Sequence, residues 1–269
     1  MNSDIVAKLP RTNILGVGIS AITMDDALTQ ISGWLESGRR EYVSVCTVHT
    51  VMECYQQKTM RDAVNNAGMT TPDGMPLVWL GKRAGLGSVS RVYGPDLMLH
   101  LCQLSALRGY TQYFYGGADG IPEKLARNLQ ARFPELKVAG AYSPPFRELT
   151  MAEDEEIIDR INKAKPDVVW VGLGTPKQDL WMASHRRKIH APVLIGVGAA
   201  FDFHTGQVRQ APRWMQQAGL EWFFRLLMEP RRLWRRYLLY NPWFLWLVFL
   251  QQTGLRKFSL EIATDSKGS

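Results

Sequence analysis

The stretch Val168–Gln178, VVWVGLGTPKQ, decides the fold class of this 269-residue chain. It begins with a short apolar run rich in valine, as expected of a strand that is buried on both faces. A glycine-rich turn follows, and Pro176 stands where the first turn of a helix tolerates proline. Strands are expected elsewhere as well, because similar apolar runs occur at Ile14–Ile19, Tyr42–Val48, Gln112–Tyr115 and Val193–Val197.

Helix-like stretches lie between these runs. Thr23 is placed to cap a helix over Met24–Ser37, and Thr150 is placed to cap a helix over Met151–Lys163. This alternation predicts an α/β fold with a Rossmann-like, mostly parallel sheet and helices on both of its faces. We expect residues 1–208 to form this core.

Composition narrows the class of protein. An apolar fraction of 46% is enough for a substantial core and argues against disorder over most of the length. The three cysteines, Cys46, Cys54 and Cys102, are an odd number, which argues against a disulfide scaffold and fits a reducing compartment. The first residues lack the apolar segment of a signal peptide, so we expect none.

The positive charge is concentrated near the C-terminus. Residues 1–208 hold 22 Lys and Arg against 21 Asp and Glu, whereas residues 209–260 hold 9 against 2. The second segment also mixes Trp and long aliphatic side chains with its arginines, and Pro230 and Pro242 divide it into two or three helices. We expect residues 209–269 to form a helical appendage whose partner is rich in phosphate.

Several structures are compatible with the composition of this appendage. A buried helical hairpin, a nucleic-acid patch and a transmembrane span are the alternatives to a membrane-surface anchor. The apolar run 242–250 has nine residues, against about 20 for a helix that spans a bilayer. A nucleic-acid groove has little use for such a run, so we favour a monotopic anchor and expect no nucleic acid as partner. The side chains predicted to contact the anionic membrane surface are Arg231, Arg236, Trp243, Phe244 and Trp246.

Polar and glycine-rich loops follow the predicted strands. Ligands of parallel α/β sheets bind beyond the carboxyl ends of the strands, so these loops are the candidates for a binding site. Glycines at strand ends can also do no more than make turns, but five loops that converge on one edge favour a single shared site. The five segments are Thr47–His49, Thr70–Gly74, Gly116–Gly120, Gly172–Gln178 and Gly198–Gly206.

Asp73 is the strongest candidate for chemistry. Pro72 biases the preceding residue toward extended backbone, and Asp73-Gly74 favours a turn, so the carboxylate is expected to project from a strand end. There it could act as a general base that takes a proton from an attacking hydroxyl. The alternative is an ordinary turn or helix cap.

Other motifs limit the chemistry. The chain has no Walker A sequence and no Asp-x-Asp, and its histidines lack ligand spacing, so we expect no metal and no cofactor. The segment GVGAAF at 196–201 has Phe where a dinucleotide fingerprint needs its third glycine. Arg91 and the loop Gly172–Gln178, by contrast, suit phosphate oxygens, because guanidinium groups and helix N-termini both bind anions.

Taken together, these motifs resemble the TagA/WecG/CpsF family of glycosyltransferases. The resemblance covers roughly residues 12 to 240, in the order and at the spacing of the family. The matching segments are TTPDGMP (70–76), RVYGPDL (91–97), GLGTPKQDLW (172–181) and GVGAAFDF (196–203) in the core. In the appendage the matches are RQAPRW (209–214), GLEW (219–222), RL (225–226), EP (229–230), Arg232 and RRY (235–237).

The resemblance implies an inverting, metal-independent transferase. Its donor would be a UDP-sugar carrying N-acetylmannosamine, its uronic acid or another hexose. Its acceptor would be a polyprenyl-diphosphate-linked saccharide in bacterial cell-surface polysaccharide synthesis. The enzyme would be peripheral, at the cytoplasmic face of the inner membrane, with an appendage that completes the active site. A homo-oligomer is left open.

The family pattern also assigns roles to single residues. Asp73 falls at the proposed catalytic base, and we expect the diphosphate of the donor to lie near the loop glycines Gly174 and Gly198. One departure is His49, where the family often has Asn; its larger, titratable imidazole bears on which sugar is bound. Family pocket positions fall on Thr47, Arg91, Gln178 and Asp202, and appendage positions on Arg225, Arg232 and Arg235.

Two classes other than a transferase stay open at this point. A nucleotide- or nucleic-acid-binding module without transferase activity would bind RNA in a salt-sensitive manner. A Rossmann oxidoreductase would hold NAD or flavin.

Overall fold

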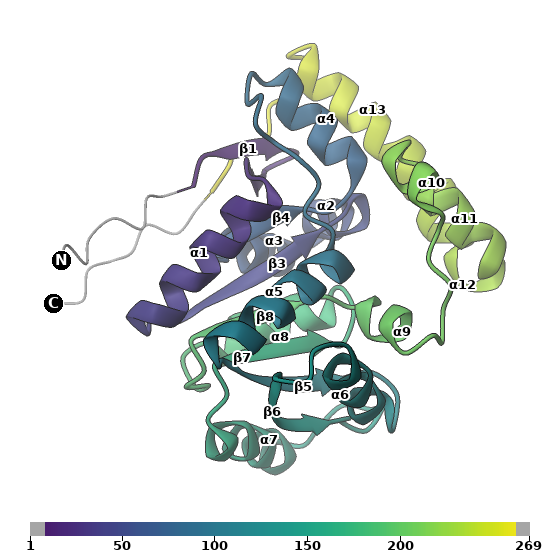
Figure 1. Cartoon of the computed structure of the whole chain (residues 1–269). Coiled ribbons are helices and arrows are strands. Elements are labelled where there is room, and N and C mark those ends of the chain that lie inside the picture. The colour runs from purple at the N-terminus through teal and green to yellow at the C-terminus, as the bar shows by residue number, and fades with distance from the viewer. Residues whose placement is uncertain (1–8, 262–269) are drawn as a thin grey trace, which may run out of the picture.

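The computed structural model describes residues 9–261 and contains the predicted α/β fold. Six strands form one sheet in the order β4-β3-β8-β7-β5-β6, and every neighbouring pair is parallel (Figure 1). The predicted Rossmann-like, parallel class is therefore confirmed. The strands are β3 (Glu41–Cys46), β4 (Met69–Pro72), β5 (Thr111–Gly116), β6 (Lys137–Tyr142), β7 (Val168–Gly172) and β8 (Val193–Gly196).

Helices cover both faces of the sheet because strand residues alternate between two apolar clusters. Phe114, Trp170 and Ile195 pack against α1 (Met24–Ser37), α5 (Gly94–Arg108) and α6 (Ile121–Arg132). Their neighbours along the strands, such as Tyr115 and Val169, pack against α7 (Met151–Ala164) and α8 (Lys177–His185) on the other face. Alongside α8 lies α3 (Lys58–Asn65), which follows α2 (Val48–Gln56).

The predicted helix starts are confirmed. Thr23 and Thr150 both form capping boxes, with side chains that accept hydrogen bonds from the backbone N–H of Asp26 and Glu153. Two strands, β4 and β6, were not among the predicted runs. β6 lies at the edge of the sheet and is at most half-buried, so it lacks the apolar composition of the central strands.

The predicted strand Ile14–Ile19 is wrong as a single element. The chain instead forms an antiparallel hairpin of β1 (Arg11–Ile14) and β2 (Val17–Ser20), which is separate from the main sheet. Leu15 and Gly16 make the turn at positive φ values of 53° and 85°. The run is apolar because the hairpin packs against α2 and the C-terminal helix.

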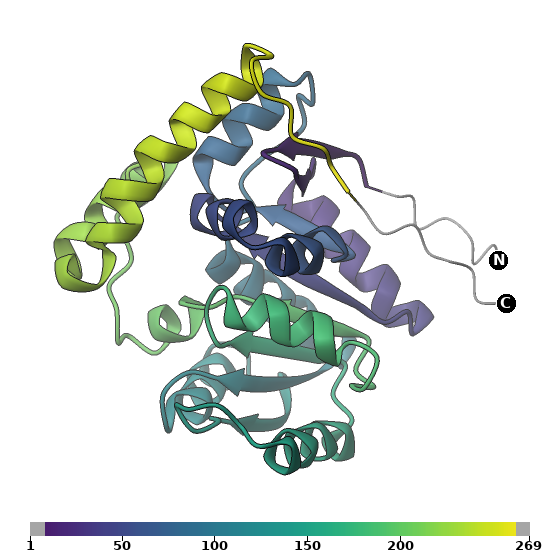
Figure 2. The same ribbon diagram turned by 180° about the vertical axis from the view of Figure 1, so that it is seen from behind.

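The C-terminal helices form an arm along one side of the molecule, and both views show α13 beside α4 (Figures 1 and 2). The chain then returns to its start, since Asn13 Nδ2 donates a 2.7 Å hydrogen bond to the Phe258 carbonyl. The division at residues 208 and 209 stays a prediction. The elements are α4 (Met75–Arg83), α9 (Ala200–His204), α10 (Arg213–Gln217), α11 (Glu221–Met228), α12 (Pro230–Trp234), the π-helix η1 (Arg235–Leu239) and α13 (Tyr240–Gln252).

Helix α13 has two apolar faces. Phe244 and Leu247 are each 2% exposed and pack in the cluster that holds Cys46 and Val51, whereas Trp246 on the opposite face is 57% exposed. The predicted membrane contact of Phe244 is therefore corrected, because this ring belongs to the core. No helix within residues 9–261 is long and apolar enough to cross a bilayer.

Replacing Phe244 should release α13 from the core. We expect Phe244→Ala to lower the free energy of unfolding by about 3 kcal/mol, because it leaves a cavity under the helix. Phe249→Ala, on the exposed face of the same helix, should change it by no more than about 0.5 kcal/mol. Chemical denaturation of both variants tests the assignment, and equal losses would contradict it.

Candidate active site

Asp73 lies directly after β4, at the carboxyl edge of the sheet. Its backbone N–H donates to the Cys46 carbonyl at the end of β3, 3.0 Å away, and its side chain is 11% exposed. One carboxylate oxygen, Oδ2, is 3.5 Å from the backbone nitrogen of Gly94. Burial raises the pKa of Asp73 to about 6, against the opposing charge of Arg91. The carboxylate is therefore poised to exchange a proton close to neutral pH.

Arg91 holds this carboxylate in place. Its Nη2 lies 3.0 Å from Asp73 Oδ1 and 2.6 Å from Glu221 Oε2, and its Nε donates to the Asp73 carbonyl. The guanidinium also lies 4.0 Å from the centre of the Tyr93 ring. Arg91 thus joins the end of β4 to α11. It was predicted to meet the diphosphate, whereas here two carboxylates share one of its terminal nitrogens.

Thr47 and His49 begin α2, next to Asp73. Thr47 is the N-cap, and a side chain added at Gly74 would lie 3.8 Å from its Cα. The His49 ring stacks on Tyr240 of α13 at 5.9 Å. Burial, followed by the charge of Arg236, lowers the pKa of His49 to about 3. The imidazole is therefore neutral at physiological pH, so its 3.7 Å approach to Glu53 is not an ion pair.

The glycine loops after β7 and β8 meet over Gln178. Gln178 Oε1 accepts a 3.2 Å hydrogen bond from the backbone N–H of Gly174. A Cβ at Gly198, where φ is +49°, would lie 3.5 Å from the same oxygen. Gly94 links this group to Asp73, because a Cβ there would lie 3.7 Å from Asp73 Oδ2 and 3.9 Å from Val197 Cβ. The loops and the carboxylate thus share one edge of the sheet.

Asp202 and two arginines of the appendage, Arg225 and Arg232, form a second group. Burial raises the pKa of Asp202, while the charges of Arg232 and Arg225 act to lower it. Arg225 lies over the Phe203 ring at 5.5 Å, and its Nε is enclosed without a hydrogen-bond partner among residues 9–261. The arm therefore reaches α9 as well as the end of β4.

Arg235 and Arg236 do not lie where their predicted roles would place them. Arg235, predicted to contact substrate, is exposed and lies 5.3 Å from the centre of the Trp234 ring. Arg236, predicted to contact the membrane, is partly buried, and its Nε is enclosed without a hydrogen-bond partner in the part of the chain that the structure describes. Its charge lowers the pKa of His49, and the charge of Asp73 acts to raise the pKa of Arg236, so Arg236 lies near the candidate site. Of the other predicted membrane contacts, Arg231, Trp243 and Trp246 are exposed.

Sequence reasoning missed two acidic residues. Asp179 is fully buried and accepts hydrogen bonds from Ser44 Oγ (2.6 Å) and Thr175 Oγ1 (3.1 Å), which fixes the glycine loop to β3. Glu221 was given no role of its own in the sequence analysis, yet its Oε2 accepts a 2.6 Å hydrogen bond from Arg91 Nη2. The sequence contained one indication of both residues: each lies inside a segment that matches the family.

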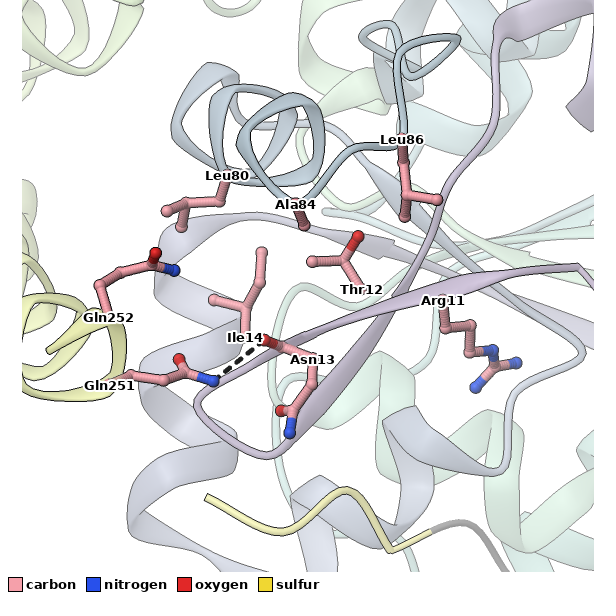
Figure 3. A pocket seen from close by; sticks show the side chains of 9 residues that line it. All are labelled: Arg11, Thr12, Asn13, Ile14, Leu80, Ala84, Leu86, Gln251 and Gln252. Atoms are coloured by element: carbon pink, nitrogen blue, oxygen red, sulfur yellow. Dashed lines mark hydrogen bonds between the residues drawn. The ribbon is translucent and has the colours of Figure 1, made fainter. Parts of the chain in front are cut away.

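Two cavities differ in their relation to these residues. One of about 230 Å³ lies between the core and α10, lined by Arg91, Tyr93, Asp96 and Gln216 among others. The larger, of about 340 Å³, lies between the β1 hairpin, α4 and the end of α13, where Gln251 Nε2 donates to the Asn13 carbonyl (Figure 3). None of the predicted site residues lines this larger cavity, so its greater volume does not make it the candidate active site.

Comparison with known proteins agrees with this geometry. Residues 12–258 match the model of the glycosyl transferase WecG/TagA/CpsF family. The chain is 29% identical over 205 residues to an N-acetylglucosaminyldiphosphoundecaprenol N-acetyl-beta-D-mannosaminyltransferase of Bacillus spizizenii, covering 76% of this chain and 77% of the relative. Relatives of the same name occur in Bacillus subtilis (30% identical; 66% and 67% covered) and Staphylococcus aureus (25%; 84% and 87%).

The family match covers most of the chain and includes both the strand-end loops and the C-terminal helices. The relatives are named as sugar transferases that act on a lipid diphosphate. The chain therefore belongs to the WecG/TagA/CpsF family and is a glycosyltransferase.

Proposed function

We propose that this glycosyltransferase moves N-acetylmannosamine, or a related hexose, from a UDP-sugar to a polyprenyl-diphosphate-linked saccharide. The acceptor hydroxyl attacks the anomeric carbon from the face opposite UDP, so the configuration inverts. Arginines rather than a metal neutralise the departing diphosphate. The reaction takes place at the cytoplasmic face of the bacterial inner membrane, in the synthesis of a cell-envelope polymer.

The buried carboxylate of Asp73 carries this proposal. A general base works best when its pKa lies near the working pH, and burial raises the pKa of Asp73 to about 6. The cavity beside Arg91 supports an acceptor site next to it, because its lining of Asp96, Arg213 and Gln216 offers hydrogen bonds to a saccharide.

Enclosed guanidinium groups support the arginine part of the mechanism. Arg225 and Arg236 each have an Nε that is shielded from solvent and lacks a hydrogen-bond partner in residues 9–261. An enclosed donor without a partner is costly unless a ligand supplies the acceptor. A diphosphate would supply acceptor oxygens of the opposite charge, and charge-assisted hydrogen bonds of this kind are strong.

An exposed apolar surface supports membrane attachment. The appendage presents side chains that are each more than one third exposed, and Arg231, Arg232 and Arg235 are exposed beside them. Aromatic and basic side chains together suit the interface of an anionic bilayer. The exposed apolar residues from η1 onward are Leu238, Leu239, Trp243, Leu245, Trp246, Phe249 and Leu255.

Activity should follow the ionisation of Asp73. The base accepts a proton only as carboxylate, so kcat/KM should rise with pH through a midpoint near the pKa of about 6. Asp73→Asn should lower the rate by about 10²–10⁴-fold without unfolding the protein. UDP release from pH 5 to 8, with a lipid-diphosphate acceptor, measures both effects. Near-normal turnover of Asp73→Asn would show that Asp73 is not the general base.

Arg236 should matter more than its neighbour for the nucleotide. We expect Arg236→Gln to weaken UDP binding by about tenfold or more, since one charged hydrogen-bonding group is lost. Arg235→Gln, a matched change at an exposed position of the same helix, should have the smaller effect. Calorimetric titration with UDP compares the two variants, and an equal or larger loss for Arg235→Gln contradicts the assignment.

Membrane binding should depend on the exposed face of α13. The double variant Trp246→Ser/Phe249→Ser removes two large exposed rings and should reduce binding to phosphatidylglycerol vesicles by about tenfold or more. Leu107→Ser, at an 80% exposed position on α5, is the control and should bind as the unmodified protein does. Cosedimentation decides, and equal binding by all three proteins would refute the surface.

A further inference from the structure

Glu221, the first residue of α11, reaches from the appendage into the core. Its Oε2 lies 2.6 Å from Arg91 Nη2, and its Oε1 accepts a 3.1 Å hydrogen bond from the Tyr93 hydroxyl. The side chains of Arg91 and Glu221 are only 17% and 15% exposed, so solvent screens their interaction weakly. Both oxygens of the carboxylate are thus directed at residues next to Asp73.

One nitrogen of Arg91 serves two carboxylates. Nη2 lies 3.0 Å from Asp73 Oδ1 and 2.6 Å from Glu221 Oε2. The positive charge of Arg91 lowers the pKa of Asp73, whereas the negative charge of Glu221 raises it. With Glu221 withdrawn, Arg91 would act on Asp73 alone, and the carboxylate would become a weaker base.

We propose that Glu221 is a positioning residue: docked on the core, it draws Arg91 away from full engagement with Asp73 and leaves that carboxylate free to take the acceptor's proton. This inference rests on the proposed role of Asp73 as the base. It makes the docked appendage a condition for proton transfer as well as for diphosphate binding. The charged and titratable groups that act on Asp73 or Arg91 are Cys46, Tyr93, Arg213, Glu221 and Arg236.

A second contact between the same two parts of the chain provides the control. Gln251 Nε2 of α13 donates a 3.0 Å hydrogen bond to the Asn13 carbonyl, and its Oε1 accepts a 3.0 Å hydrogen bond from the Leu15 N–H. These bonds also join the appendage to the core, but they lie at the β1 hairpin, beside a cavity whose lining includes neither Asp73 nor Arg91. Loss of docking alone should therefore follow from a change at Gln251 or at Glu221, whereas a shift in the pKa of the base should follow only from Glu221.

The test is the pH dependence of kcat/KM for the full-length protein with Glu221→Gln, Glu221→Asp and Gln251→Ala. Glutamine removes the charge but keeps a hydrogen-bond acceptor, and should shift the acid midpoint down by about one pH unit. Aspartate only withdraws the charge and should give a smaller shift in the same direction. Should Glu221→Gln not fold, this second variant carries the test. Gln251→Ala should keep the unmodified midpoint.

One common midpoint for all four proteins, with activity reduced equally at every pH, would overturn the inference and leave Glu221 as a structural contact. That result, together with an inactive Asp73→Asn, leaves the proposed function standing. Transfer by Asp73→Asn would instead overturn the proposed base and this inference together, because the midpoint would then belong to another group.

Discussion

The candidate active site depends on one guanidinium group that two shielded carboxylates share. Arg91 ties Asp73, at the end of β4, to Glu221, at the start of α11. Two carboxylates around one guanidinium give these three side chains a net negative charge, and a net charge is costly in a buried setting. Arg236 and the other arginines of the appendage lie close enough to influence the same region, so the C-terminal helices supply both the excess negative charge and its compensation.

Besides these contacts, the C-terminal helices present an exposed apolar surface. Helix α13 is apolar on two faces: Phe244 and Leu247 fasten it to the hairpin and α2, and Trp246 and Phe249 remain exposed. A helix of this kind can lie between a protein core and a lipid surface. The C-terminal helices therefore bring Arg236 of η1 near His49 and Asp73 and leave large rings exposed where the proposed membrane contact would form.

Sequence patterns predicted the parts of the fold that local chemistry determines. The run at 168–178 became β7 and α8, and Thr23 and Thr150 cap the helices expected of them. Ile14–Ile19 was misassigned because an apolar run does not reveal its partner, and a hairpin under α13 buries it as well as a sheet would. β6 was not predicted because an edge strand that is only half-buried lacks a run of apolar residues.

Sequence patterns predicted several residues of the candidate site but not the contacts between them. Asp73, Gly174, Gln178 and Gly198 meet at one edge, as strand-end loops of a parallel sheet should. Glu221 stands 130 residues from Arg91, and no local pattern announces that pairing. The roles of Arg235 and Arg236 depend on the rotation of the helix that carries them, and these neighbours fall within a π-helical turn that sequence periodicity did not reveal.

The central claim is that a shielded carboxylate at the end of β4 titrates near neutrality. Carboxyl-carbon NMR of protein labelled in aspartate, compared with the Asp73→Asn variant, isolates its signal. The account predicts that this signal titrates at a pKa of about 6. A midpoint at or below about 4, the ordinary range of aspartate, would contradict it, because the carboxylate would then be too weak a base for the proposed proton transfer.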